Sequence, residues 1–242
     1  LPGLDLNGVF ALRDLDDARA IKRHLNDTLV KRVIIVGAGY IGMEMADVLH
    51  GLGIEVAVLE QADQVLPGYA PAIVDVARRE LDRHGVRVET GAAIEAIESA
   101  GADLVVRPDR AQLPAQLVIV AVGVRPEVAL PRQAGIALGE TGAVAVDEQM
   151  RTNLADVFAA GDCAEAHHRV LGRPAWIPLG PTANKQGKVA GANAAGAHEC
   201  FGGIVGSAGF KLFDLEVART GLASAEIARA GIACVCAVSH HH

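Results

Sequence analysis

Long apolar runs are absent from the sequence. Purely apolar stretches such as residues 117–122 are short, whereas a helix needs about 20 apolar residues to cross a bilayer. The first residues also lack the charged segment and the following apolar segment of a secretory signal. The sequence therefore predicts no membrane partner, and the cytoplasm is the expected location.

Clusters of basic residues are also absent. The 242 residues include 22 Lys and Arg against 29 Asp and Glu, which gives a formal net charge of −7. Proteins that bind nucleic acids or anionic membranes through electrostatics need clustered Lys and Arg. Nucleic acid is therefore not expected as a partner.

Cysteine is scarce, and the four cysteines form no motif: Cys163, Cys200, Cys234 and Cys236. No two of them are separated by two residues, and they lack the dense, even spacing of a secreted disulfide framework. We expect reduced thiols, which agrees with a cytoplasmic location.

Histidines occur in two runs that lack the spacing of metal ligands. His167 and His168 are adjacent on an expected loop, and we predict that both are solvated. Residues 240–242 are interpreted as the visible part of a purification tag, with a natural loop as the alternative. No metal site is predicted from either run.

Between residues 31 and 125, segments typical of strands alternate with segments typical of helices. Short β-branched runs predict buried strands, and apolar residues at helical spacing predict helices. The expected strands cover 32–36, 54–59, 86–88 and 117–122, and the expected helices cover 41–52 and 72–84. This alternation predicts an α/β fold with a parallel sheet. An antiparallel excursion is expected at 92–107, and a helix over 14–25 leads into the sheet.

The pattern changes after residue 125, where proline and glycine become frequent. Chains of this length usually form more than one compact unit, so we place a boundary here. Beyond it the sequence predicts strands at 143–146 and 157–160, a helix at 183–195, and then, within 207–238, a strand pair, a helix at 224–230 and the beginning of a last strand. The expected division is 1–30, 31–125, 126–203 and 204–242, the first part being a linker with the lead-in helix.

Three glycines follow the first expected strand of the sheet and open a helix: Gly37, Gly39 and Gly42. This spacing and context are typical of a Rossmann dinucleotide site. Gly37 would permit the tight turn, Gly39 would let the backbone approach the pyrophosphate, and Gly42 would allow close packing of helix on strand. The phosphates would lie at the helix N-terminus, where free N–H groups favour negative charge.

An acidic residue, Glu60, follows the second strand at about the distance that the dinucleotide fingerprint requires. Its carboxylate would accept hydrogen bonds from the ribose hydroxyls and repel a 2′-phosphate. Gln61 and Ala62, the next residues, offer no cation to a phosphate. The sequence therefore predicts NAD as a cofactor, with NADH preferred over NADPH. The alternative is a plain tight turn with Glu60 as a solvated strand end.

Two further carboxylates allow two interpretations each. Glu44 lies in the first turn of the helix, where it either stabilises the helix start or faces the nicotinamide. Asp162 follows Gly161 at the end of an apolar run, where it either belongs to an ordinary turn or binds a polyol hydroxyl.

Five segments together resemble the pyridine nucleotide-disulfide oxidoreductase family. They cover residues 36–44, 123–126, 159–163, 183–188 and 205–222. The first four appear in the order of the family, the last resembles the entry to a dimerisation domain, and the likeness extends over essentially the whole chain. Within the family the chain is most similar to the branch of NADH oxidases, NADH peroxidases and coenzyme A-disulfide reductases.

The resemblance implies FAD as a second cofactor and suggests roles for several residues. Asp162 would contact the flavin ribityl chain, and the loop through Ala183 and Asn184 would lie beside the flavin. Tyr40 would line the nicotinamide pocket, with Glu44 near it. The remaining cofactor-binding candidates lie in the same matched segments: Ile41, Gly123 and Gly161.

In family terms, residues 31–125 form the NAD-binding domain, 126–203 the C-terminal half of the FAD-binding domain, and 204–242 the start of a dimerisation domain. The resemblance implies that the chain is an internal fragment. A first glycine motif and the redox cysteine are expected upstream of Leu1, so none of the four cysteines is predicted to be catalytic. The complete protein is expected to be a homodimer, and this chain alone is expected to be inactive.

The function implied is hydride transfer from NADH to FAD, followed by electron transfer to a small-molecule acceptor. The acceptor would be a disulfide, persulfide, peroxide or oxygen. Two alternatives stay open: a ferredoxin-type flavoprotein reductase without a redox cysteine, and a module that senses NADH without consuming it.

Overall fold

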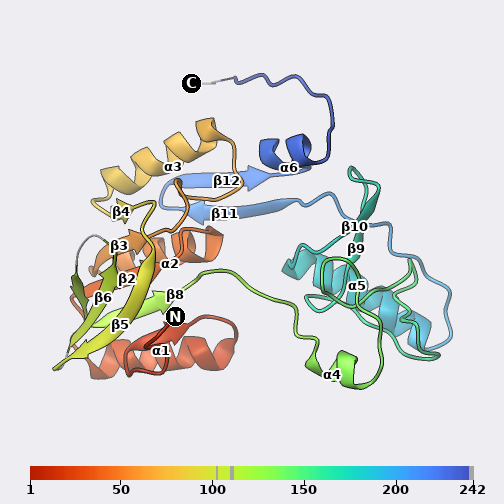
Figure 1. The fold of residues 1–242 in the computed structure, drawn as a ribbon, viewed down its shortest axis with the longest axis horizontal. Helices are drawn as coiled ribbons and strands as arrows, with labels where there is room; N and C mark the ends of the chain where they lie inside the picture. The colour runs from red at the N-terminus through yellow and green to blue at the C-terminus, as the bar shows by residue number, and fades with distance from the viewer. Residues whose placement is uncertain (102, 110–111, 240–242) are drawn as a thin grey trace. The chain divides into compact units, whose positions relative to one another are not determined.

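The computed structural model describes residues 1–101, 103–109 and 112–239, so the histidines at 240–242 lie outside the described residues (Figure 1). The chain divides into two compact units. Unit 1 comprises residues 1–123 and 210–217 with the described residues from Val235 on, and unit 2 comprises 124–209 and 218–234. None of the helices within the described ranges has both the length and the apolar character needed to span a membrane.

A five-stranded parallel sheet forms the centre of unit 1, in the order β1-β8-β2-β3-β4. Its strands are β1 (Val9–Ala11), β2 (Arg32–Val36), β3 (Glu55–Leu59), β4 (Arg87–Glu89) and β8 (Leu117–Val120). The β-branched runs of β2, β3 and β8 are buried on both faces, as the sequence predicts for a covered parallel sheet. The α/β fold with a parallel sheet is therefore confirmed. The edge strand β1 was not predicted, because a three-residue strand carries too little pattern.

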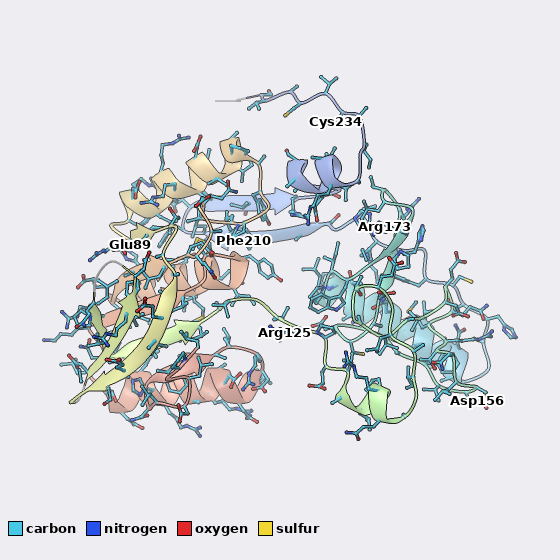
Figure 2. The ribbon with its side chains drawn as sticks, in the orientation of Figure 1. Glu89, Arg125, Asp156, Arg173, Phe210 and Cys234 are labelled. Atoms are coloured by element: carbon cyan, nitrogen blue, oxygen red, sulfur yellow. The ribbon has the colours of Figure 1, made fainter. Side chains whose placement is uncertain are left out.

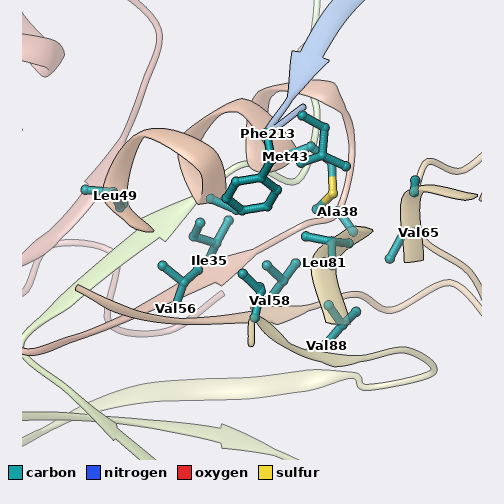
Figure 3. Packing of buried hydrophobic residues seen from close by; sticks show 14 of the residues in the cluster. Ile35, Ala38, Met43, Leu49, Val56, Val58, Val65, Leu81, Val88 and Phe213 are labelled. Carbon is teal, nitrogen blue, oxygen red and sulfur yellow. The ribbon is translucent and has the colours of Figure 1, made fainter. Parts of the chain in front are cut away.

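The helices of unit 1 alternate with the strands: α1 (Leu15–Asp27), α2 (Tyr40–Gly51) and α3 (Pro71–Arg83). Apolar side chains of these helices share a core cluster with one face of the sheet, including Ile35, Met43 and Leu81. Figure 3 shows α2 lying over this face, with Ile35, Val56 and Val58 of the strands below the helix. Leu49, one of the periodic apolar residues of α2, lies in this core, whereas Val48 and the C-cap residue Leu52 are 58% and 63% exposed, so the spacing predicted the helix but not its buried face.

The opposite face of the sheet is covered by three antiparallel strands: β5 (Ile94–Ala100), β6 (Asp103–Pro108) and β7 (Leu113–Ala115). Ile97, Leu104 and Val106 of these strands pack with Ile34 and Val36 of β2 in a second apolar cluster. The antiparallel excursion predicted for this part of the chain is confirmed.

Unit 2 contains little regular structure besides one long helix. Its elements within 124–209 are α4 (Ala129–Gln133), β9 (Ala166–His168), β10 (Arg173–Ala175) and α5 (Gly180–Ala194). The predictions of strands at 143–146 and 157–160 were wrong, since these segments form only isolated bridges such as Val144 to Ala164 and Arg151 to Phe158. Turns closed by Gly142 and Met150 flank the first segment, and turns closed by Val157 and Ala164 flank the second, so neither segment extends into a ladder.

The last part of the chain forms a hairpin, β11 (Ala208–Leu212) and β12 (Leu215–Arg219), followed by α6 (Ser224–Arg229). The strand pair and the helix agree with the sequence. Apolar residues of the hairpin belong to the core of unit 1, among them Phe210, which Figure 2 labels, and Phe213. The prediction of a last strand was wrong, because the exposed segment around Cys234 pairs with no described strand.

Candidate functional site

The loop between β2 and α2 requires glycine at two of its three motif positions. Gly37 has φ +106°, and a Cβ there would lie 2.3 Å from the carbonyl oxygen of Ala121. A Cβ on Gly42 would lie 2.0 Å from the carbonyl oxygen of Gly37. Both positions therefore exclude side chains because backbone packs directly against them.

Gly39 differs from the other two glycines because its side-chain position is open. A Cβ added there would meet nothing within 4 Å. Gly39 is the N-cap of α2, has extended backbone at φ −73°, and brings no capping side chain to the helix start. The missing side chain leaves room for a ligand against the first turn of the helix, where N–H groups point outward.

Glu60 is tied to the glycine loop through its carboxylate. Its Oε2 accepts a hydrogen bond from the backbone N–H of Ala38 at 2.7 Å, and its Oε1 accepts one from the N–H of Ala62 at 2.8 Å. The residue is half-buried, and each oxygen keeps a second lone pair for a further donor. Glu60 therefore holds the loop in addition to the ribose role predicted for it.

The segment after Glu60 supports the same loop from another side. The N–H of Leu66 donates to the carbonyl oxygen of Ala38 at 2.8 Å, so both backbone groups of Ala38 are bonded. Val65 and Leu66 are buried in the core of unit 1. Sequence reasoning missed this segment, although two apolar residues within a polar loop were a signal for it.

Ile41 and Glu44 lie on one cavity of about 450 Å³ in unit 1. The cavity is further lined by Leu12, Met45, Asp47, Val48 and Lys211. Glu44 is exposed, and its carboxylate shares the cavity with apolar side chains, an arrangement that suits a ring with a polar substituent. Tyr40, exposed at the start of α2, is not among the lining residues.

Gly123 lies just beyond β8, where the chain leaves the sheet of unit 1. It has φ +105°, is exposed, and has open space at its side-chain position. The neighbouring Ala121 donates its N–H to the carbonyl of Val36 at 2.7 Å. The end of β8 therefore lies beside the start of the glycine loop.

In unit 2 the structure brings Gly161, Asp162 and Ala183 together. Gly161 has φ +82°, and a Cβ there would lie 3.4 Å from the Cβ of Ala183 in the first turn of α5. Asp162 is exposed, and its carbonyl oxygen accepts a hydrogen bond from the indole N–H of Trp176 at 2.7 Å. Asn184 is also exposed on α5.

Gln186 is a site residue that the sequence analysis did not select. Its side-chain oxygen accepts the N–H of Gly161 at 2.9 Å, and its side-chain nitrogen donates to the carbonyl of Glu165 at 3.1 Å. The signal was present, because Gln186 lies in the matched segment 183–188. Sequence alone does not reveal that its amide is buried.

The prediction that His167 and His168 are both solvated was half wrong. His167 is exposed, but His168 is fully buried because β9 pairs with β10 and turns alternate side chains inward. Its Nδ1 accepts hydrogen bonds from the N–H groups of Val170 and Leu171, both at 3.3 Å. Burial lowers the pKa of His168, an effect only partly opposed by the negative charge of Glu226.

A cluster of possible metal ligands in unit 1 contains an internal cation. Ligand atoms of Glu80, His84 and Asp214 lie within 4.8 Å of one another. The guanidinium of Arg83, however, donates to Glu80 at 2.7 Å and to Asp214 at 2.6 Å. Burial alone would raise the pKa of Glu80, but Arg83 and the N–H of Asp214 outweigh it and lower the pKa. This cluster is an ion-pair network between α3 and the hairpin.

The comparisons with known proteins agree on one family. Residues 1–193 match the family model described as pyridine nucleotide-disulphide oxidoreductase. An NAD(P)H sulfur oxidoreductase (CoA-dependent) of Pyrococcus abyssi is 37% identical over 96% of this chain and 52% of its own length. The chain spans about half the length of the curated relatives it matches.

Solved structures show the same similarity. An NAD-dependent persulfide reductase from A. fulgidus has a TM-score of 0.90 and 34% identity, over 96% of this chain and 43% of that chain. The water-forming NADH oxidase of Lactobacillus brevis, solved with NADH, has a TM-score of 0.89 and 29% identity over 96% of this chain and 51% of that chain. An engineered mutant of that oxidase, solved with NADPH, has a TM-score of 0.89 and 28% identity over the same shares of the two chains.

Proposed function

The chain belongs to the pyridine nucleotide-disulphide oxidoreductase family, and on that premise we propose that it supplies the NADH site and part of the FAD site of a flavoprotein oxidoreductase. In this proposal residues 31–125 form the NAD-binding domain, 126–203 the C-terminal half of the FAD-binding domain and 204–242 the start of the dimerisation domain. The observation that carries the proposal is the open position at Gly39, between two glycines that backbone packing requires.

The glycine loop fits a dinucleotide because its open side-chain position, at Gly39, lies at the start of α2. The pyrophosphate would lie against Gly39 and the first N–H groups of α2, which also favour its negative charge. Glu60 would accept hydrogen bonds from the adenosine ribose with the lone pairs that Ala38 and Ala62 leave free. Ile41 and Glu44 would face the nicotinamide end through their shared cavity.

The turn at Gly161 and Asp162 fits one section of a flavin site. An exposed carboxylate on a backbone turn that is fixed by hydrogen bonds suits the hydroxyls of a ribityl chain. Ala183 and Asn184 of α5 would lie along the same cofactor, and Gly123 stays a cofactor-binding candidate of unit 1. When bound, FAD supplies the chemistry of accepting hydride and passing electrons onward. The residues of this chain bind and orient the two cofactors.

The acceptor proposed for the whole protein is a small molecule. The names of the relatives include a sulfur oxidoreductase, a persulfide reductase and a water-forming NADH oxidase, and a disulfide, peroxide or oxygen is proposed as acceptor on the same chemistry. We also propose a cytoplasmic location and a homodimer. The four cysteines are free thiols, which supports the cytoplasmic location. The dimer rests on the family resemblance and is tested by light scattering of the protein that carries this chain.

The preference for NADH is supported by Glu60 itself and by the spacing of Gly42, Glu60 and Pro67. The engineered oxidase solved with NADPH carries substitutions at a glycine and at an aspartate eighteen residues later. It is also substituted at the two residues after that aspartate and at a proline seven residues beyond the aspartate. Gly42, Glu60 and Pro67 stand at the same spacing in this chain. Gln61 and Ala62 follow Glu60 and carry no positive charge.

The proposal predicts that the purified chain binds NADH at least about tenfold more tightly than NADPH, because Glu60 repels the 2′-phosphate. Titrations that follow nucleotide fluorescence measure both affinities. Combining Glu60→Gln with Gln61→Arg should reverse the preference, since the amide can keep a hydrogen bond from the loop while the guanidinium attracts phosphate. Glu55→Ala, at the other end of β3, is the matched control and should leave the preference intact. Equal or tighter binding of NADPH by the unaltered chain contradicts the proposal.

A further inference from the structure

Gln186 joins both ends of a short segment that contains Asp162. The side chain of Gln186 is 1% exposed, and it accepts the N–H of Gly161 while donating to the carbonyl of Glu165. A buried amide without partners is costly, and here both of its ends are bonded to backbone. Gln186 therefore connects α5 to residues 161–165 through two hydrogen bonds.

Trp176, which follows β10, also holds the turn at Gly161 and Asp162 through a hydrogen bond. Its indole N–H donates to the carbonyl oxygen of Asp162 at 2.7 Å, from a position directly after β10. Gly161, with φ +82°, also lies against Ala183. The backbone on both sides of the Asp162 side chain is thus held by contacts from sequence-distant residues, whereas the carboxylate itself belongs to an exposed residue.

We infer that Gln186 and Trp176 are positioning residues for the flavin-contacting turn. The inference rests on the proposed function, in which Asp162 binds the ribityl chain. Hydrogen bonds to a polyol depend on sub-ångström placement of the carboxylate, and such placement comes from the contacts that lock the backbone beneath it. Gln186 and Trp176 act on FAD through the turn, by fixing the position of Asp162 before the cofactor arrives.

Asn193 provides a matched control on the same helix. It is 6% exposed and has a buried side-chain amide like that of Gln186. Its nitrogen donates to the carbonyls of Gln149 and Glu199 at 2.9 and 2.8 Å, and its oxygen accepts the N–H of Glu199 at 2.7 Å. Asn193 thus connects α5 to the loops that contain Gln149 and Glu199, and it makes no hydrogen bond to the turn at Gly161 and Asp162.

The experiment compares four variants of the protein that carries this chain: Gln186→Met, Trp176→Phe, Asn193→Leu and Asp162→Ala. Each is stripped of flavin and titrated with FAD while the quenching of the flavin's own fluorescence is followed, and thermal unfolding and NADH affinity are measured in parallel. Gln186→Met should weaken FAD binding about tenfold relative to Asn193→Leu, although both lose buried hydrogen bonds and should melt at similarly lowered temperatures. Trp176→Phe keeps an aromatic ring and loses only the donor, so it should fold and bind FAD about threefold to tenfold more weakly.

Each outcome separates the inference from the proposed function. Failure of the unaltered protein to bind FAD, or unchanged FAD affinity in Asp162→Ala, would contradict the proposed function. If Asp162→Ala weakens binding while Gln186→Met and Asn193→Leu have equal FAD affinities, the positioning role is wrong. Should Gln186→Met fail to fold, Trp176→Phe decides alone, and unaltered FAD affinity in it overturns the inference. NADH affinity should stay constant in all four variants.

Discussion

Unit 1 and unit 2 are stabilised by different interactions. Both large apolar clusters lie in unit 1, where helices and antiparallel strands cover the two faces of a parallel sheet. Of the five buried polar or charged residues in the described part of the chain, four belong to unit 2: Glu165, His168, Gln186 and Asn193. Unit 1 therefore depends mainly on apolar burial, whereas unit 2 depends on side chains that bond to irregular backbone.

The largest expected effect tests the apolar core of unit 1. Ile35 on β2 is fully buried, and Ile35→Ala should lower the free energy of unfolding by about 2–5 kcal/mol because it removes apolar contacts and leaves a cavity. Urea unfolding followed by circular dichroism measures the loss. Trp176 is the single tryptophan and lies in unit 2, so its fluorescence reports separately on that unit. A loss below about 1 kcal/mol would show that the burial of Ile35 contributes little to the stability of unit 1.

A smaller effect tests the buried polar groups of unit 2 through pH. Because burial lowers the pKa of His168, the folded chain binds this proton more weakly than the unfolded chain, whose histidine titrates near pH 6.5. Unfolding therefore takes up a proton in acid. The stability that neutral His168 provides should be fully present above about pH 6.5 and decline as the pH falls from there toward the lowered pKa.

His168→Asn should remove this part of the pH dependence. The Asn side-chain oxygen can replace Nδ1 as acceptor for the N–H groups of Val170 and Leu171. The matched control is His167→Asn, which alters an exposed neighbour and should keep the slope. Unfolding followed by Trp176 fluorescence between pH 5 and 8, roughly the range in which histidine titrates, measures both variants. An unchanged slope in His168→Asn would mean that other groups control the acid sensitivity of unit 2.

The same contrast explains how much of the fold could be predicted from the sequence. In unit 1 the β-branched run before Gly37 reports burial directly and apolar residues at helical spacing mark the helices, so the sheet and its helices were predicted, although Val48 and the C-cap residue Leu52 of α2 are exposed. In unit 2 the segments at 143–146 and 157–160 have strand-like composition, but their hydrogen bonds go to turns and single bridges. Composition does not reveal where such bonds go, and for that reason the strand predictions failed there.

The candidate site shows the same limit. The spacing of Gly37, Gly39 and Gly42 is a local pattern with a local cause, and the geometry of each position could be anticipated. The hydrogen bond from Ala38 to Glu60 and the two bonds of Gln186 join residues that are distant in sequence. Such contacts depend on the tertiary fold, so a single sequence names the residues without their partners.

The most direct test of the account is an NADH titration of Gly39→Val, with thermal unfolding measured on the same samples. The φ of Gly39 suits valine, and its side-chain position has nothing within 4 Å. We expect an unchanged melting temperature and NADH binding weakened roughly 100-fold or more, because the new side chain occupies the space of the pyrophosphate. Gly37→Ala is the contrasting control and should lower the melting temperature, since its Cβ meets the Ala121 carbonyl at 2.3 Å. Undiminished NADH affinity in a well-folded Gly39→Val chain would contradict the assignment of the glycine loop as the coenzyme site.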